Sequence, residues 1–303
     1  MLIRTTGEVS QNIHLITIGS SCTYVAGNAA LTLFDSCLSG QVELYIKKLA
    51  ALGLSLDSVS SIFITHLHAD RIGGIPLIRK INPKINLITS QAIESELIKP
   101  EVMEKIFKDN QTLNATIAST KNDLMSLAEF TSLFSVSAIV RADDTVSIGD
   151  GITVRIIAAP GHTKESLCYL IQPQQLLIVD EGFGYFKMRG FTAPGAEYSL
   201  ESNNSTLSKI LSLDIKGLCL PSAGVITGSL VRKHINNLIS NTAGMLDECV
   251  EAFKIGMTEE EVKLGVINSF YTDDSKDPLF TYNLDQTFQK IWPQIKAFIQ
   301  SKN

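Results

Sequence analysis

The sequence predicts an α/β fold of the mixed α+β kind, and three observations support it. Short apolar segments with the alternation typical of strands fill residues 13–89 and return at residues 136–220. Amphipathic helical segments separate several of these strands, as expected where neighbouring strands run parallel. From residue 229 to the end, the apolar residues recur at helical spacing.

The composition is that of a chain with a sizeable core. The chain has 303 residues, of which 45% are hydrophobic, enough for one large domain or one and a half. The net charge of −5 provides no basic surface for nucleic acid or for an anionic membrane. No apolar run reaches the roughly 18 residues of a membrane helix.

The cysteines and the first residues predict a reducing compartment. Residues 1–11 are polar and lack the apolar core of a secretory signal peptide. The five cysteines are scattered, with neither CxxC nor metal-ribbon spacing. We therefore expect a cytoplasmic protein in which each thiol is reduced and serves as a small buried hydrophobe. These residues are Cys22, Cys37, Cys168, Cys219 and Cys249.

The first ninety residues are expected to form strands that lead into strand–helix units. Gly27-Asn28 predicts a hairpin turn between two strands, and Gly53 ends an amphipathic helix. The expected strands cover residues 13–18, 23–26, 30–34, 61–65 and 85–89, and the expected helices cover residues 41–52 and 75–80.

A helical insertion is expected at about residues 90–135, because this part has no strand-like run and many helix formers. The expected helices are 91–98, 101–107, 113–118 and 123–134. The strands then return at 136–140, 145–148, 152–158, 167–171, 176–179 and 217–220, with Asp150-Gly151 and Pro173-Gln174 as turns.

Residues 229–303 predict a helical C-terminal extension packed on the domain formed by residues 1–228. Helices are expected over 229–253, interrupted near Gly244, and over 283–300. Between them, Thr258 and Glu261 form a capping box that begins a helix to about residue 271, followed by a linker over 273–278. The sequence does not decide whether this extension shapes an acyl pocket or a homodimer face.

Two histidines and an aspartate occupy alternate positions directly after the strand over 61–65. They are His66, His68 and Asp70, and Arg71 follows them. In open α/β sheets, binding sites lie on the loops that leave the strands. Neutral imidazole suits Zn, Fe, Cu or Ni, and a carboxylate is a harder companion ligand. The spacing therefore favours a metal site.

His66-x-His68-x-Asp70 after such a strand resembles the signature of the metallo-β-lactamase superfamily, over roughly residues 10–230. The resemblance implies a four-layer αββα sandwich, in which two mixed sheets face each other, with the helical insertion over the site. It also implies that His162, within Pro-Gly-His-Thr, is the third histidine of the first metal, and that Asp180 bridges two metals. Lactamases of this family often have cysteine at that last position, so Asp180 disfavours a β-lactam specialist.

The sequence departs from the family pattern at two positions. Arg71 and Ala223 stand where further histidines are usual, which leaves the second ion only Asp70 and Asp180. Arg71 either repels that ion or pairs with Asp70 and replaces its charge. We expect a first site for Zn, or for Fe or Mn, that fills readily, and a second site that is weak or empty.

The resemblance implies a metal-dependent hydrolase that uses a metal-activated water on an ester-like bond: a thioester, a lactone or a related carboxyl derivative. Asp70 would act as the general base. Arg71 would hold a substrate carboxylate or the developing oxyanion, or would only position Asp70. An insertion rich in Leu, Ile, Met and Phe suits a small-molecule substrate with an apolar acyl part.

Two other functions remain open from the sequence. One is a degenerate family member that binds a ligand or regulates with little turnover, which Arg71 and Ala223 favour. The other is a flavodiiron-like redox protein. This is disfavoured because that branch typically has Glu where His68 stands and carries a flavodoxin domain, for which the chain has no room.

Overall fold

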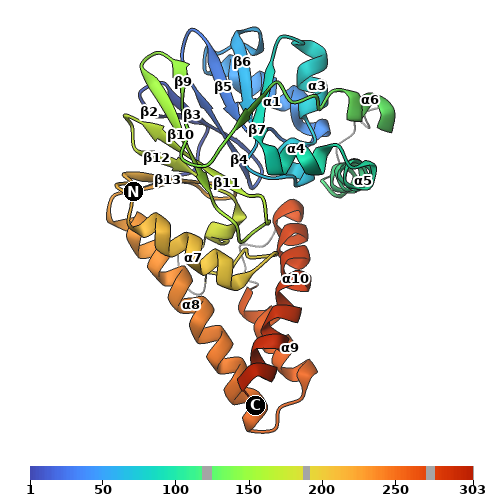
Figure 1. Cartoon of the computed structure of the whole chain (residues 1–303), viewed down its shortest axis with the longest axis vertical. Helices are drawn as coiled ribbons and strands as arrows, with labels where there is room; N and C mark the ends of the chain where they lie inside the picture. Colours follow the sequence, from blue (N-terminus) through green and yellow to red (C-terminus); the bar gives the residue numbers. More distant parts are fainter. Residues whose placement is uncertain (118–124, 187–191, 271–276, 303) are drawn as a thin grey trace.

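Two seven-stranded sheets face each other in the computed structural model, and helices cover their outer faces (Figure 1). The structure describes residues 1–117, 125–186, 192–270 and 277–302. Apolar side chains of both sheets, such as Leu15 and Phe63 from one and Val154 and Tyr169 from the other, belong to one buried core. The expected four-layer αββα arrangement is therefore confirmed.

The sheet that carries the His66 motif has the order β2-β3-β4-β5-β6-β7-β8. Strands β2 to β5 are antiparallel, and β5 to β8 run parallel. The strands are β2 (Gly7–Ser10), β3 (Ile13–Ile18), β4 (Ser21–Ala26), β5 (Leu31–Phe34), β6 (Val59–Phe63), β7 (Asn86–Ser90) and β8 (Ala138–Val140).

The second sheet has the order β1-β14-β13-β12-β11-β10-β9. Its strands are antiparallel except for β12 and β13, which are parallel. They are β1 (Leu2–Ile3), β9 (Thr145–Gly149), β10 (Ile152–Ala158), β11 (Leu167–Gln172), β12 (Leu176–Ile178), β13 (Gly217–Leu220) and β14 (Gly224–Thr227).

The helices of the first two thirds of the chain lie around the sandwich, and α8 to α10 extend away from it (Figure 1). The shorter helices are α1 (Val42–Ala51), α2 (Ala69–Ile72), α3 (Ile75–Ile81), α4 (Gln91–Leu97), α5 (Pro100–Thr116), α6 (Leu127–Ser132) and α7 (Leu200–Leu211). The C-terminal helices are α8 (Ser229–Lys254), α9 (Glu259–Phe270) and α10 (Pro278–Lys302). Single 3₁₀ turns are η1 (Ser39–Gln41), η2 (Leu56–Ser58) and η3 (Glu181–Phe183).

The helical insertion is present, but its division into helices was predicted wrongly. The two helices expected over 101–107 and 113–118 are the single helix α5. Within it, Asn110 and Asn114 are buried and donate to Ser39 Oγ of η1, each at 2.8 Å. These amides fasten α5 to the sandwich. The helix expected over 123–134 is only α6, and residues 118–124 lie outside the described residues.

The C-terminal extension is helical as predicted, with different boundaries. Helix α8 continues through Gly244 without interruption, and α10 begins at Pro278, five residues earlier than expected. Thr258 and Glu261 form the predicted capping box, with the Thr258 amide donating to Glu261 Oε2 at 2.8 Å and the Glu261 amide donating back to Thr258 Oγ1 at 3.3 Å. The expected linker falls largely on residues 271–276, outside the described residues.

The extension has an apolar cluster of its own, which includes Met245 of α8, Val266 of α9 and Phe288 of α10. Tyr185 and Ala193, from the segments on either side of residues 187–191, belong to the same cluster. The extension therefore packs on the sandwich beside the end of β12. We retain as a proposal that residues 1–228 are one domain and that residues 229–303 are its extension. None of the described helices is long and apolar enough to cross a membrane.

Candidate metal centre

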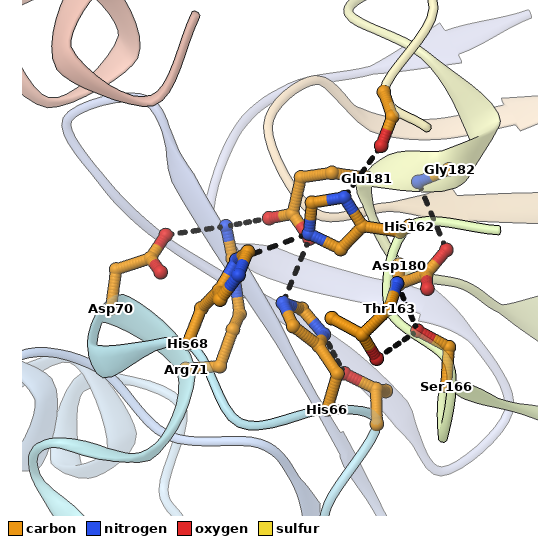
Figure 2. A network of polar contacts seen from close by, with 12 residues as sticks. His66, His68, Asp70, Arg71, His162, Thr163, Ser166, Asp180, Glu181 and Gly182 are labelled. Atoms are coloured by element: carbon orange, nitrogen blue, oxygen red, sulfur yellow. Dashed lines mark hydrogen bonds and ion pairs between the residues drawn. The ribbon is translucent and has the colours of Figure 1, made fainter. Parts of the chain in front are cut away.

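Three histidines from two loops meet at the end of β6. His66 and His68 lie between β6 and α2, and His162 lies on the loop between β10 and β11. Their ring centroids are 4.6 to 4.7 Å apart in every pair. One nitrogen of each ring lies within 4.8 Å of the other two. Figure 2 shows the three rings turned toward a common point. The structure thus brings together the three imidazoles that the sequence suggested.

Hydrogen bonds to neighbouring protein groups engage the Nδ1 atoms of two of these histidines. His162 Nδ1 lies 2.6 Å from the Gly195 carbonyl. Because a carbonyl can only accept, Nδ1 carries a proton, and in the neutral ring Nε2 has the lone pair. Thr65 donates its hydroxyl proton to Asp35 Oδ2 at 2.7 Å and accepts from His66 Nδ1 at 2.9 Å. His66 Nε2 is buried and has no hydrogen-bond partner.

The third ring presents its other nitrogen to the centre. His68 Nδ1 lies 3.1 Å from His162 Nε2, while His68 Nε2 lies 3.5 Å from Glu197 Oε2. Glu197 in turn forms an ion pair with Lys290 of α10. A carboxylate that accepts from the outer nitrogen of a ligating histidine fixes its tautomer and orientation. Glu197 and Lys290 were missed by the sequence reasoning, since neither belongs to a motif.

The protonation of the rings suits metal binding. Burial lowers the pKa of His66 well below its usual range and lowers that of His68 to about 4, which keeps both imidazoles neutral. Burial acts in the same direction on His162, but the surrounding carboxylates, Glu197 foremost, outweigh it and raise its pKa. A metal must displace such a proton to bind. Three convergent ring nitrogens, one of them buried without a partner, fit a divalent cation such as zinc.

Arg71 pairs with two buried carboxylates beside the imidazoles. Its NH2 group lies 3.2 Å from Asp70 Oδ2 and 2.7 Å from Glu181 Oε1, and its NH1 group donates to the Cys22 carbonyl at 3.2 Å. Its side chain is 3% exposed. Arg71 therefore forms the ion pair with Asp70 that was one of the two alternatives left open by the sequence. It is not among the residues that line the cavity over the histidines.

The group of three convergent histidines includes neither Glu181 nor Asp180. Asp180 Oδ1 accepts from the Gly182 amide at 3.0 Å, and Figure 2 shows the side chain turned toward Gly182. The next residue, Glu181, points the other way. Its Oε2 lies 3.3 Å from His66 Nε2 and 3.5 Å from His162 Nε2. The sequence reasoning missed Glu181 because it followed the family motif to the preceding position.

Helix α7, which the sequence did not predict, holds the loop of His162 and the η3 turn of Glu181. Thr206 donates to the Pro160 carbonyl at 2.7 Å, and Asn203 donates to the Gly182 carbonyl at 2.9 Å. Gly195 lies so close to the backbone of Glu181 that an added Cβ would be 1.7 Å from the Glu181 carbonyl oxygen. Only glycine fits there, and its carbonyl is the acceptor for His162.

Helices α5 and α10 enclose the centre. A cavity of about 50 Å³ lies over the histidines. Asn283 of α10 donates to Asp70 Oδ2 at 3.0 Å. The lining is mostly polar and includes residues from both helices: His68, Ala69, Asp70, Lys105, Asp109, Leu113, His162, Glu181, Tyr185, Glu197, Tyr282, Asn283, Gln286 and Lys290. The helical insertion therefore contributes α5 to the wall of the site.

Ala223 lies at the turn between β13 and β14 and is buried. It lines a separate cavity of about 210 Å³, together with Cys22, Ser222 and Phe186. The family pattern has its last histidine at this position, and here the small Ala223 side chain lies beside open space. The carbonyl of Cys22, which lines the same cavity, accepts a hydrogen bond from Arg71 NH1.

Comparison with known proteins identifies the class to which this fold and site belong. The family model described as the metallo-beta-lactamase superfamily matches residues 16–179, more than half of the chain. The chain belongs to this superfamily, whose members are generally hydrolases. The resemblance read from the His66 motif is confirmed.

Among curated proteins, the chain is similar to an atrochrysone carboxyl ACP thioesterase of Aspergillus fumigatus, with 24% identity over 70% of this chain and 53% of that protein. A Claviceps purpurea protein of the same name is 23% identical over 57% of this chain and 43% of its own length. The chain thus spans about half the length of these fungal thioesterases. A beta-lactamase-like protein 2 homolog of Caenorhabditis elegans is 24% identical over 85% of this chain and 72% of that protein.

Solved structures of low identity share the fold. A metallo-beta-lactamase family protein from Thermus thermophilus has a TM-score of 0.61 and 16% identity, covering 95% of both chains. An archaeal superfamily protein from Sulfolobus tokodaii has a TM-score of 0.60 and 14% identity, covering 94% of this chain and 98% of that chain. At such identities the likeness concerns the fold alone.

Proposed function

We propose that this chain is a hydrolase of an ester-like bond that uses one divalent ion held by His66, His68 and His162. The observation that carries the proposal is the convergence of their three ring nitrogens beside a cavity that His68 and His162 line, with the outer nitrogens close to protein groups. Zinc is the first choice, with iron or manganese as alternatives. We propose a single ion because Arg71 already neutralises the carboxylates beside this centre.

Asp70 is the residue we assign as general base. It lines the cavity together with His68, His162 and Glu181. Asn283 and Arg71 both hold its Oδ2 atom, which fixes the carboxylate and leaves Oδ1 for a proton. A divalent ion held by these histidines would supply a water of lowered pKa and polarise the carbonyl to be attacked. Asp70 would accept a proton from the attacking water and pass it to the leaving group.

Arg71 is proposed to act through Asp70 and Glu181. Because its guanidinium is enclosed and outside the cavity lining, the substrate contact suggested by the sequence has no support in this geometry. A buried arginine between two carboxylates holds both in a fixed orientation.

A thioester, lactone or related carboxyl derivative is the proposed substrate class, and the fungal thioesterase relatives favour the thioester. In the cavity lining, Leu113 and Tyr282 offer apolar surface to an acyl part, while Lys105 and Lys290 would favour a substrate with a negative charge elsewhere. At about 50 Å³ the cavity is too small for an acyl chain. Binding would thus require α5 and α10 to separate.

A substrate panel tests the proposal. Acyl-CoA, lactone, β-lactam and phosphodiester substrates are offered to the wild type, to Asp70→Asn, and to Asp285→Asn, an exposed carboxylate of α10 outside the site. We expect turnover of an ester-like substrate that Asp70→Asn lowers by about 10²–10⁴-fold, whereas Asp285→Asn leaves it unchanged. Chelation should abolish turnover, and zinc should restore it.

Metal analysis of the same preparations should give one ion per chain. Two chelator-resistant ions would contradict the single-ion centre. Ligand binding without turnover of any substrate would favour the ligand-binding or regulatory alternative over a hydrolase.

Two finer expectations remain proposals. A cytoplasmic location is supported by five free, buried cysteines, as a reducing compartment would keep them. A homodimer through the C-terminal helices is consistent with Ile255 and Leu264, which are exposed near the far end of the extension. Light scattering of the purified chain tests the second.

A further inference from the structure

The Glu181 carboxylate lies between the imidazoles and the Arg71 guanidinium. One oxygen, Oε2, faces His66 Nε2 and His162 Nε2 at 3.3 and 3.5 Å. The other oxygen, Oε1, lies 2.7 Å from the Arg71 guanidinium. The side chain is 4% exposed. It comes from η3, at the end of β12, and thus from a different segment than any of the histidines.

The contacts of Oε2 need a proton or a metal ion between the facing atoms. His66 donates its Nδ1 proton to Thr65, and His162 donates its Nδ1 proton to the Gly195 carbonyl, so both Nε2 atoms face Glu181 with lone pairs when the rings are neutral. A carboxylate oxygen facing two such lone pairs is repelled unless a proton or a metal ion lies between them. His66 Nε2 and Glu181 Oε2 lack a hydrogen-bond partner in a buried site, where such groups cost about 1–3 kcal/mol each.

Asp180 is held away from this point by the local backbone. Its side chain caps η3 by accepting from the Gly182 amide, which directs it to the side opposite Glu181. The cap occupies Asp180 Oδ1, while Oδ2 is buried and accepts no hydrogen bond from the described residues. The two adjacent carboxylates therefore have separate roles: Asp180 fixes the turn, and Glu181 faces the imidazoles.

We propose that Glu181, and not Asp180, is the carboxylate ligand of the ion held by His66, His68 and His162. Arg71 binds the second oxygen of the same carboxylate and takes the place of a second cation. This assignment rests on the proposed function only in that an ion occupies the three-histidine centre. It concerns the chain's own ligand set, whatever the substrate.

Neighbouring substitutions of equal size provide the test. Glu181→Gln and Asp180→Asn each replace a buried carboxylate by the isosteric amide, so the two variants control for one another. Zinc affinity is measured by competition with a chromophoric chelator. Circular dichroism of the metal-free proteins shows that each variant folds. We expect Glu181→Gln to weaken zinc binding by at least about tenfold, and Asp180→Asn to leave it unchanged within error.

A measurement on the wild type requires no variant. Crystals grown with zinc should show, by anomalous scattering, one ion with a Glu181 oxygen at about 2.0–2.2 Å. An Asp180 oxygen in that position, or zinc binding that is weakened by Asp180→Asn and not by Glu181→Gln, would overturn the assignment. If the wild type binds no zinc, the proposed function and this inference both fail. Zinc bound through Glu181 without hydrolysis of any substrate would support the inference and reject the function alone.

Discussion

The site has two halves with different charged groups: an imidazole half, formed by the three histidines, and an arginine half, formed by Arg71 and its carboxylate partners. On one side, His66, His68 and His162 direct ring nitrogens at a common point. On the other side, the Arg71 guanidinium is already bound to two carboxylates and to the Cys22 carbonyl. Glu181 belongs to both halves, with one oxygen turned to each.

The difference shows how one ion can suffice in a site of this class. A metal ion and a guanidinium both neutralise buried carboxylates, but the guanidinium is permanently charged and cannot be removed by a chelator. Only the imidazole half then depends on the metal supply. The arginine half is part of the folded structure itself. The predictions that follow treat the two halves separately.

The largest effect is expected in the imidazole half. His162→Ala removes one of three ligands that lie within 4.8 Å of each other, so we expect the loss of stoichiometric metal and of hydrolysis. Elemental analysis and the activity assay measure both. His234→Ala is the matched control, since His234 is also buried but bonds to the Phe183 carbonyl outside the centre. One retained zinc per chain in His162→Ala would remove this histidine from the ligand set.

In the arginine half, the expected effect is on stability. Arg71→Met leaves the carboxylates of Asp70 and Glu181 buried without their cation, and we expect the free energy of unfolding to fall by about 3–5 kcal/mol. Urea denaturation of the metal-free protein measures it. Arg155→Met breaks an ion pair with Asp143 that is largely exposed, and it should cost much less, because solvent screens the pair. Equal costs for the two variants would contradict a structural role for the Arg71 pair.

A pH effect of intermediate size is expected from Asp35, which holds Thr65 and through it His66. Burial raises the pKa of Asp35 from 3.8 to about 7 in the folded protein. Between these values the folded state binds the proton and the unfolded state does not. Stability is therefore lost as pH rises through this window.

The loss between pH 5 and pH 8 should be on the order of 2 kcal/mol for the metal-free wild type. Urea denaturation at the two pH values measures it. The Asp35→Asn variant should lack this component, because the amide does not titrate. The same loss in both proteins would assign the effect to another group.

The smallest effect is expected at the contact between α10 and Asp70. Asn283→Ala removes one hydrogen bond to a carboxylate, which should lower kcat/KM by about tenfold. Zinc affinity should not change, since the imidazole half is untouched. Lys296→Ala, which breaks an ion pair with Glu259 farther along α10, should change neither quantity. A fall in zinc affinity for Asn283→Ala would show that the two halves are coupled through α10.

The fold was predictable because its signals are local. Alternating apolar residues marked β3 and β10 at their observed boundaries, and Thr258 with Glu261 marked the start of α9. The errors arose where a tertiary contact outweighs local preference. Two helices were expected over 101–107 and 113–118, but α5 is continuous, and its Asn110 and Asn114 donate to Ser39 of η1. Helix α7 was not predicted, although it holds the loop of His162 and the η3 turn.

The sequence by itself determined where the imidazoles are, since the spacing of His66 and His68 after a strand and the Pro-Gly setting of His162 are local features. It also placed a permanent cation at Arg71. Only the tertiary structure decided which carboxylate reaches them. The direction of a side chain after β12 depends on how the backbone turns into η3, so that Asp180 caps the turn and Glu181 enters the site. The contacts from Glu197 and Asn283 arise in the same way, because residues more than a hundred positions from their partners meet only when the chain is packed.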